Sequence, residues 1–542
     1  MKHRSSQVIC CWWMGAIRRS DILPENFQGD LMQKKIIGAI LALVLIAAGF
    51  YIVENTRLFK DSPNVIIILT DDLDYSLMPY MEKTNELIGE QGATLTNFFV
   101  TTPACCPSRT SIIRGQYSHN TDILENAPGF PRFFKLKQEE NALPVWLNEA
   151  GYQTALFGKY MNNYPINAGM EYVPPGWTDW GAFVTTEVTI NYYYNYTMNE
   201  NGTLVKYGDT PEDYSTDVIR DKSLKFINER AQDEQPFFLF ISVYAPHGPS
   251  TAAPRHETLF NDLSYPKGPS FNEEDLSDKP ELIRALSETG EEFDEGDANY
   301  LFQARARSLQ AADELVEDVI LALEKNGQLE NTYIIFTSDN GFHLGEHRMP
   351  SGKGTPYEED IRVPFFIRGP GIEPDTTISQ LSANIDIAPT IADIVSVQVP
   401  DFVDGRSFLP FLLGRDAEWR QALLIEFGQI LEYTSSDSQS LAVKPDPSLA
   451  TFVDPETDNL LSGIGGGSFR GIRTDTFIFV KYENGEFEYY DLLTDPYQLE
   501  NTANQLDPET LNQLQEWLDQ LKRCSGQDCR KFEQSPPQGI LD

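Results

Sequence analysis

The chain has 542 residues, of which 81 are acidic and 42 are basic, so its formal net charge is -39 at pH 7. Phosphate binding requires a basic surface, so this balance argues against nucleic acid as a partner. Hydrophobic residues make up 41% of the chain, enough for a substantial core, which excludes intrinsic disorder of the whole chain. If the substrate is an anion, the site must concentrate positive charge locally.

An apolar segment lies near the N-terminus. Residues 36–53, IIGAILALVLIAAGFYIV, carry no charge and are just long enough to span a bilayer. Lys34 and Lys35 precede this segment, so residues 1–35 are expected to stay cytoplasmic, although Met32 offers an alternative start. The segment is either a transmembrane signal anchor or a signal peptide, and we favour the anchor because no convincing cleavage site follows. The rest of the chain is expected to face the periplasm or the exterior, or to be secreted after cleavage.

Short β-branched apolar runs alternate with helical patterns along the next part of the chain. In chain order they predict a strand at 64–72, a helix at 214–231, a strand at 236–248, a helix at 298–327 and a strand at 332–341. This alternation predicts an α/β fold in which helices sandwich a large, mostly parallel sheet. We assign this catalytic domain to residues 62–400.

The C-terminal part has a different pattern. Alternating residues around ENGE, within 469–496, predict a hairpin, and a helix is expected at 508–524. Residues 401–530 are therefore expected to form a smaller α+β subdomain. The acidic stretch 271–297 is expected to be a solvated insertion loop.

Each of the three predicted strands ends in polar residues. These residues are Asp71 and Asp72, His247, and Asp339 and Asn340. In open α/β sheets, ligands bind outside the carboxyl ends of the strands, so the five side chains are expected to converge on one site.

The cysteines occur in pairs. Cys524 and Cys529 lie in CSGQDCR with no accompanying histidine cluster, so we expect a small disulfide and hence an oxidising compartment. Cys105 and Cys106 are either buried core residues or part of a metal or disulfide framework. Because Pro107 is typical of a first helical turn, Cys105 is expected at a helix N-terminus, where a thiol pKa is lowered.

The stretch CCPSRTSIIRG, residues 105–115, resembles the signature of the type I sulfatases, in which the cysteine is oxidised to formylglycine (3-oxoalanine). The resemblance implies that Cys105 is modified by a formylglycine-generating enzyme, with Cys106 at the variable position. It covers roughly residues 62–500 and implies the alkaline-phosphatase-like fold. The motifs GKYMNNY, APHGP and CSGQDC are most similar to the branch that acts on N-acetylglucosamine 6-sulfate and heparan sulfate.

The resemblance also implies the roles of the site residues. It implies a Ca²⁺ site, with Mg²⁺ as an alternative, and an all-oxygen set of side chains suits such hard cations. The implied ligands are Asp71, Asp72, Asp339, Asn340 and the modified Cys105. It further implies that Arg109 holds the hydrated formylglycine and that Lys159 and Lys353 neutralise sulfate oxygens. His247 is then the acid that protonates the leaving oxygen.

The sequence departs from the family pattern at one position. Many sulfatases have a histidine two residues after the first lysine, where this chain has Met161 followed by Asn162. The base that deprotonates the diol is therefore open. His119, His343 and His347 are candidates, with Asn162 as a further neighbour, and the alternative for each histidine is a supporting or surface role.

The expected function is hydrolysis of a sulfuric ester on a carbohydrate, with 6-O-sulfated N-acetylglucosamine as the first candidate. Within the same superfamily, the alternatives are a broad-specificity arylsulfatase and a phosphonate or phosphate monoester hydrolase. Outside it, they are an inactive membrane-bound protein that binds sulfated glycans, and ordinary cysteine chemistry at the Cys105–Cys106 pair.

Overall fold

The structure is a computed structural model that describes residues 62–185, 192–233, 235–287, 293–428 and 468–541. The apolar segment expected to act as a signal or anchor, residues 36–53, lies outside these ranges. Of the helices within them, none combines the length and apolarity needed to cross a membrane.

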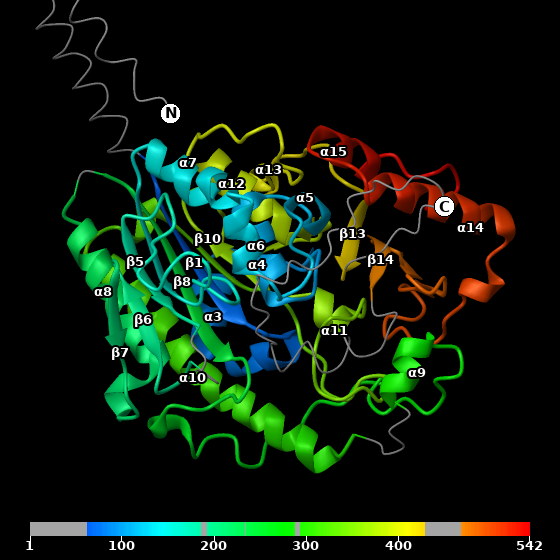
Figure 1. Cartoon of the computed structure of the whole chain (residues 1–542), viewed down its shortest axis with the longest axis horizontal. Coiled ribbons are helices and arrows are strands. Elements are labelled where there is room, and N and C mark those ends of the chain that lie inside the picture. Colours follow the sequence, from blue (N-terminus) through cyan, green and yellow to red (C-terminus); the bar gives the residue numbers. More distant parts are fainter. Residues whose placement is uncertain (1–61, 186–191, 234, 288–292, 429–467, 542) are drawn as a thin grey trace, which may run out of the picture. The chain divides into compact units, whose positions relative to one another are not determined.

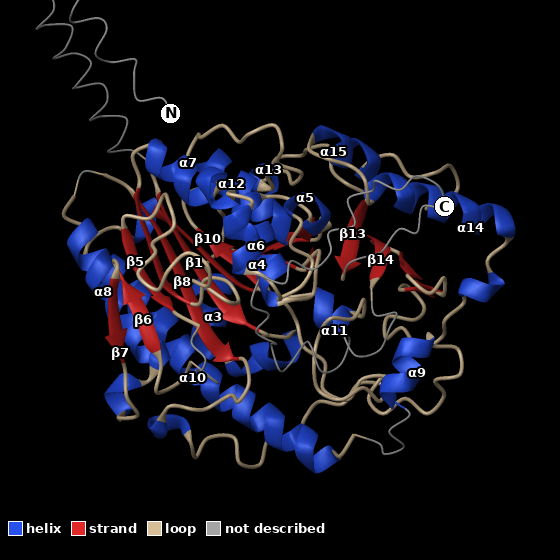
Figure 2. Cartoon of the chain, viewed as in Figure 1, coloured by secondary structure: helices blue, strands red, loops and turns tan. Residues whose placement is uncertain are grey.

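A ten-stranded mixed sheet forms the centre of the described part (Figures 1 and 2). Neighbouring strands β9, β1, β8, β4 and β5 run parallel, while β10 and β6 join the two sides antiparallel. The expectation of a mostly parallel sheet is confirmed. In spatial order the strands are β11 (Thr376–Ile378), β2 (Ala93–Leu95), β10 (Phe365–Arg368), β9 (Thr332–Ser338), β1 (Asn64–Asp71), β8 (Phe237–Pro246), β4 (Gln153–Gly158), β5 (Asp179–Phe183), β6 (Thr197–Glu200) and β7 (Thr203–Lys206).

Strand β1 is buried along its whole length because helices cover both faces of the sheet. Val65, Ile67 and Leu69 pack into one apolar cluster, and the alternate residues Ile66 and Ile68 pack into another. The first cluster lies under α4 (Cys105–Arg114), α7 (Leu143–Glu149) and α12 (Ile387–Ile394), and the second lies under α8 (Ser215–Arg230) and α10 (Glu295–Lys325).

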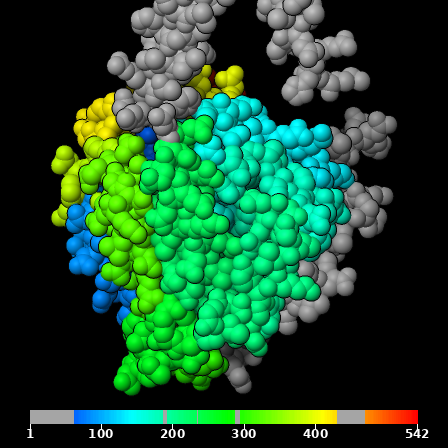
Figure 3. Space-filling view, turned by 90° about the vertical axis from the view of Figure 1, so that its left-hand side faces the viewer, coloured from blue at the N-terminus to red at the C-terminus, as the bar shows by residue number. Residues whose placement is uncertain are grey.

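The face shown in Figure 3 is formed mainly by the teal and green segments, which include α8 and α10. Shorter helices complete the covering layers and the loops between them. They are α3 (Glu82–Thr84), α5 (Ser118–Thr121), α6 (Phe130–Lys135), α9 (Glu281–Ser287), α11 (Glu358–Ile361) and α13 (Leu409–Leu412).

A second, antiparallel sheet forms the C-terminal part, as predicted for this region (Figure 1). Its order is β13 (Ala422–Phe427), β14 (Phe469–Thr474), β15 (Phe477–Tyr482) and β16 (Phe487–Asp491), followed by α14 (Pro508–Leu521) and α15 (Gln527–Glu533). The buried guanidinium of Arg420 fastens this part to the rest, because it pairs with Asp386 before α12 and with Glu533 of α15. Residues 62–542 cluster as one unit, so the division at residue 400 stays a prediction.

The acidic stretch 271–297 is not simply a solvated loop. It contains α9, and Glu273 and Lys279 are buried. Lys279 Nζ pairs with Glu273 Oε1 at 2.9 Å and also donates to the Leu499 carbonyl in the C-terminal part. The composition misled because one internal cation compensates the acidic residues that turn inward.

Candidate active site

The polar residues at the strand ends meet the start of α4. Ligand atoms of Asp71, Asp72, Cys105 and Asp339 all lie within 4.8 Å of one another. Asp71 ends β1, Asp339 follows β9, and Cys105 is the first residue of α4. These side chains are fully buried. The structure thus brings together residues far apart in sequence, at the carboxyl edge of the central strands.

Two lysines bind the paired aspartates directly. Lys159 Nζ donates to Asp71 Oδ2 at 2.5 Å, and Lys353 Nζ donates to Asp72 Oδ1 at 2.5 Å. Lys353 Nζ also lies 2.9 Å from Cys105 Sγ. An anion at Cys105 would therefore meet an ammonium group already held in place by a carboxylate.

Arg109 lies one helical turn beyond Cys105 and contacts the aspartates from the side. Its Nε donates to Asp339 Oδ2 at 2.7 Å, and its Nη2 lies 3.5 Å from Asp71 Oδ2. Its Nη1 donates to Ser242 Oγ at 2.7 Å and to the Lys159 carbonyl at 2.9 Å. In this structure Arg109 orders the carboxylates, whereas the sequence resemblance implies contact with the hydrated formylglycine.

Three carboxylates and three permanent cations balance one another in the cluster. Burial raises the pKa of Asp71, but Lys159, His247 and Arg109 outweigh burial and hold the pKa far below its usual range. Lys353 likewise lowers the pKa of Asp72 against the effect of burial. The pKa of Asp339 is raised, because burial and the nearby Asp71 charge exceed the attraction of Arg109. The carboxylates therefore repel one another despite their basic partners.

The expectation of a lowered thiol pKa at Cys105 is wrong. Burial and the charge of Asp71 raise the pKa well above its ordinary value, although Lys159 and Lys353 act in the opposite direction. Burial also raises the pKa of Cys106, to about 12. Because a cysteine nucleophile reacts as the thiolate, both values disfavour ordinary cysteine hydrolysis at this pair.

Two buried oxygens make the acidic residues suitable for a cation. Asp72 Oδ2 and Asn340 Oδ1 have no hydrogen-bond partner among the described residues. Asn340 Nδ2 donates to Asp72 Oδ1 at 2.7 Å, so the amide turns its oxygen away from that carboxylate oxygen. Buried oxygens without a donor are costly in a folded protein. An oxygen-rich set of this kind fits a hard divalent cation such as Ca²⁺ or Mg²⁺.

His247 joins the cluster from the end of β8. Its Nε2 lies 3.8 Å from Asp72 Oδ2, and Nδ1 lies 2.9 Å from the Gly248 carbonyl. An Nδ1 proton donated to this carbonyl would leave Nε2 toward the cluster. Tyr244 packs against both basic residues here: its ring centroid is 4.5 Å from the His247 ring and 5.6 Å from Lys159 Nζ.

His343 and His347 support the loop that carries Lys353. His343 Nδ1 lies 2.9 Å from Asp360 Oδ1, and its backbone pairs with Gly352, the residue before Lys353. Burial lowers the pKa of His343, but Asp360 outweighs burial and leaves it raised. His347 Nδ1 lies 2.6 Å from Glu273 Oε2. These contacts favour supporting roles over the role of base.

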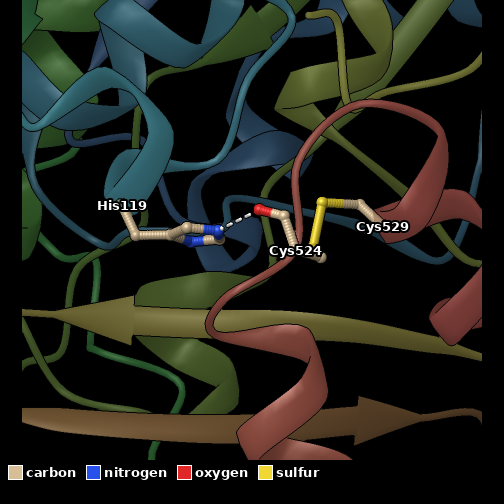
Figure 4. A group of neighbouring side chains, drawn as sticks. All are labelled: His119, Cys524 and Cys529. Carbon is tan, nitrogen blue, oxygen red and sulfur yellow. Dashed lines mark hydrogen bonds between the residues drawn. A yellow bond between two sulfur atoms is a disulfide. The ribbon is translucent and has the colours of Figure 1, made fainter.

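His119 contacts the C-terminal part of the chain (Figure 4). Its Nδ1 lies 3.0 Å from Glu426 Oε1 on β13, and its Nε2 lies 3.0 Å from the Cys524 carbonyl. Cys524 and Cys529 form a disulfide, the pairing expected from the sequence. The proximity of His119 to these two sulfurs is therefore no metal site, because neither sulfur is a thiolate.

We expect His119→Gln to destabilise the protein more at pH 6 than at pH 9. Burial lowers the pKa of His119, but the charge and hydrogen bond of Glu426 leave it raised. A raised folded-state pKa stabilises fully below the unfolded value of about 6.5, and this contribution is lost as the pH rises through the folded value. Unfolding midpoints of wild type and variant across this range measure the difference. A gap that is constant with pH contradicts the expectation, and a kcat loss above about 100-fold would instead identify a base.

Sequence reasoning missed several residues at the site, and Asn162 and Met161 turn out to lie behind Cys106. The Asn162 carbonyl accepts from Phe130 N–H, and Met161 Sδ lies 3.9 Å from Thr110 Oγ1. Ser242, which holds Arg109, gave no signal because it is one hydroxyl within an apolar strand. Such a residue is identifiable only when the register of neighbouring strands is known.

Comparison with known proteins gives a consistent picture. The sulfatase family model matches residues 63–397. The N-acetylglucosamine-6-sulfatase of Capra hircus is 37% identical over 486 residues, covering 86% of this chain and 85% of that protein. The N-acetylglucosamine-6-sulfatase of Homo sapiens is 36% identical over 512 residues, covering 90% of each chain.

The fold has solved counterparts. A protein solved in complex with its substrate D-glucosamine-2-N,6-O-disulfate aligns with a TM-score of 0.66 and 24% identity. The alignment covers 88% of this chain and 100% of that one. At this identity the likeness establishes the fold alone.

Proposed function

Because the chain belongs to the sulfatase family and is a sulfuric ester hydrolase, we propose that it removes the 6-O-sulfate from N-acetylglucosamine in a sulfated glycan. The observation that carries this substrate is similarity over 90% of both chains to a human enzyme named for that reaction. The similarity extends well beyond the signature at 105–115 into the loops and the C-terminal part. It includes the regions that approach the sugar from outside the buried cluster.

The proposed nucleophile derives from Cys105. In the structure its Sγ marks the position of the formylglycine side chain, 3.4 Å from Asp71 Oδ1 and 2.9 Å from Lys353 Nζ. Formylglycine supplies, as its hydrate, one hydroxyl that attacks sulfur and a second whose deprotonation releases sulfate. A formylglycine-generating enzyme is the partner that this maturation requires.

We further propose Ca²⁺ as the cation at Asp71, Asp72, Asp339 and Asn340, with Mg²⁺ as the alternative. The unsatisfied oxygens Asp72 Oδ2 and Asn340 Oδ1 support this assignment. Bound there, a divalent ion would polarise a sulfate oxygen and stabilise charge in the transition state.

The remaining residues act on the anionic group and on the leaving oxygen. Lys159 and Lys353 are buried cations beside the reacting position, so they neutralise sulfate oxygens in a site that excludes water. Arg109 fixes Asp339 and Asp71 against rotation. His247 presents an imidazole nitrogen next to Asp72 and is proposed to protonate the sugar oxygen as it leaves.

The proposed location is outside the cytoplasm. The Cys524–Cys529 disulfide supports an oxidising compartment, and two relatives from Drosophila melanogaster and Caenorhabditis elegans are named extracellular sulfatases. An exported enzyme meets polysaccharides rather than cytosolic metabolites.

The substrate proposal is tested with N-acetylglucosamine 6-sulfate, its 3-O- and 4-O-sulfated isomers, a small aryl sulfate and a phosphonate monoester. We expect kcat/KM for the 6-sulfate to exceed each of the others by at least about 100-fold, because a polar site rejects ligands that leave its groups unpaired. Sulfate release confined to the aryl ester overturns the sugar assignment. Faster phosphonate cleavage would favour the alternative hydrolase of the same superfamily.

A salt series adds a control for long substrates. With a net charge of -39, the protein repels a polyanion at long range. Moderate salt should therefore raise kcat/KM for a long sulfated chain and affect the monosaccharide less, because the Debye length falls from about 30 Å at 0.01 M to about 10 Å at 0.1 M. Equal salt dependence for both substrates would show that long-range repulsion does not limit binding.

A further inference from the structure

The turn at the end of β1 has an uncommon backbone. In an extended strand, successive side chains point to opposite faces of the sheet, so Asp71 and Asp72 could not reach one point. Asp72 instead has φ of 68°, in the left-handed region that few residues other than glycine adopt. Both carboxylates consequently belong to the same group of ligand atoms. The left-handed turn is what converts two neighbours in sequence into two neighbours in the site.

This turn is held on three sides. Asp72 N–H donates to Asp339 Oδ1 at 3.2 Å, and Leu73 N–H donates to Ser338 Oγ at 2.8 Å. The Asp72 carbonyl accepts from Arg305 Nη2 at 2.5 Å. A sparsely populated backbone conformation persists only where its surroundings determine it in this way.

Arg305 reaches the turn from α10, on the opposite side from the reacting groups. It is 2% exposed, and its Nη2 also lies 2.8 Å from Asp74 Oδ2. Asp74 in turn accepts from Ser76 N–H at the start of the 3₁₀ helix η1 (Tyr75–Tyr80). One guanidinium therefore ties together the carbonyl of Asp72 and the first residue of the structure that follows.

Arg305 also contacts the second ligand-bearing segment. Its guanidinium carbon lies 4.1 Å above the centroid of the Phe342 ring. Phe342 follows Asp339 and Asn340 in the loop after β9. A planar cation that both donates in its plane and stacks on a ring is a property of arginine that lysine does not reproduce.

We propose that Arg305 is a positioning residue for the metal site: by clamping the left-handed turn of Asp72 against the Phe342 loop, it holds the two ligand-bearing segments at the spacing that the cation requires. The inference rests on the metal binding put forward under the proposed function. Arg305 acts through the Asp72 backbone and does not touch the sulfate ester. Its effect should therefore show first in cation affinity, with or without a substrate.

The test measures Ca²⁺ binding to chelator-treated full-length protein by isothermal titration calorimetry. We expect Arg305→Met to weaken Ca²⁺ binding by about 10- to 100-fold, the range typical of residues that orient metal ligands. Arg305→Lys should recover part of the loss, because an ammonium group can satisfy the Asp72 carbonyl or Asp74 but does not reproduce the planar contact with Phe342. Raised Ca²⁺ in the assay should restore kcat in both variants.

Arg420→Met is the matched control. Arg420 is also buried, pairs with Asp386 and Glu533, and lies 5.2 Å from the Trp419 ring centroid, but it is remote from the metal ligands in these contacts. It should lower the unfolding midpoint while leaving the Ca²⁺ affinity unchanged. If Arg305→Met does not fold, Asp74→Asn weakens the same clamp and is expected to lower the affinity several-fold.

The outcomes separate the two proposals. Wild-type protein that binds neither Ca²⁺ nor Mg²⁺ overturns the metal site and this inference with it. Wild-type binding together with an unchanged affinity in folded Arg305→Met, or in Asp74→Asn, overturns the clamp alone. An equal loss of affinity in Arg420→Met would also overturn it, because the effect would then be general destabilisation.

Discussion

Cys105→Ala is expected to lower kcat for sulfate release by at least about 10³-fold, while Cys106→Ala lowers it only a few-fold. Cys105 is the side chain that faces the aspartates and Lys353. Cys106 faces the apolar cluster on the other side, so its loss leaves a small cavity and costs about 1 kcal/mol of stability. Steady-state kinetics with N-acetylglucosamine 6-sulfate and unfolding midpoints measure the two effects separately.

The same position carries a chemical signature. In active enzyme, the peptide containing Cys105 should have lost one sulfur and two hydrogens and gained one oxygen. Cys105→Ser is the matched control: it retains one hydroxyl, so it is expected to release at most one equivalent of the sugar alcohol and then to stop. Full activity with an unmodified Cys105 contradicts the proposed nucleophile, as does sustained turnover by Cys105→Ser.

Local pattern was sufficient for the central layers of the fold. The β-branched runs of β1, β8 and β9 are long and bounded by polar residues, so their period and their ends are legible in the sequence. Strands β2 and β10 were not anticipated, because three or four residues are too few to show a period. They are strands because they pair with a neighbour already in place, which is a property of tertiary structure.

The site divides along the same line. The strand-end argument identified Asp71, Asp72 and Asp339 as neighbours, and the structure brings them together. Lys159 and Lys353 came from family resemblance, since a lysine in a loop is otherwise indistinguishable from a solvated one. No local pattern could reveal Arg305, because its role depends on the three-dimensional approach of α10 to a turn more than 200 residues away.

Charge effects were the least accessible from sequence. The position of Cys105 at a helix start was correct, but the sign of its pKa shift depends on burial and on Asp71, which local sequence does not supply. The histidines show the same limit. His119, His343 and His347 all lie in motif regions, and only their partners Glu426, Asp360 and Glu273 distinguish supporting residues from a base.

Removal of the divalent cation is expected to abolish turnover and to lower stability together. Without a cation, Asp72 Oδ2 and Asn340 Oδ1 stay unsatisfied and the three carboxylates repel one another. Chelator-treated protein should therefore lose at least about 10²-fold in kcat, since the ion's stabilisation of transition-state charge is lost. Binding at 100 times Kd should restore about 2.7 kcal/mol of unfolding free energy, measured as a rise in the unfolding midpoint on adding Ca²⁺.

Asp72→Asn tests whether this cation occupies the proposed site. The substitution preserves shape but removes a charge from the ligand set, so it should weaken Ca²⁺ binding and largely remove the stabilisation that Ca²⁺ confers. Asp404→Asn is the control, because Asp404 is also buried but accepts from Tyr117 N–H and Gly526 N–H in another part of the fold. Burial raises the pKa of Asp404 to about 6, so its stability response is best compared at pH 7.5, where the wild-type carboxyl is ionised. A Ca²⁺-dependent rise that survives in Asp72→Asn and disappears in Asp404→Asn would place the cation elsewhere, and full activity in metal-free wild type would remove it from the reaction.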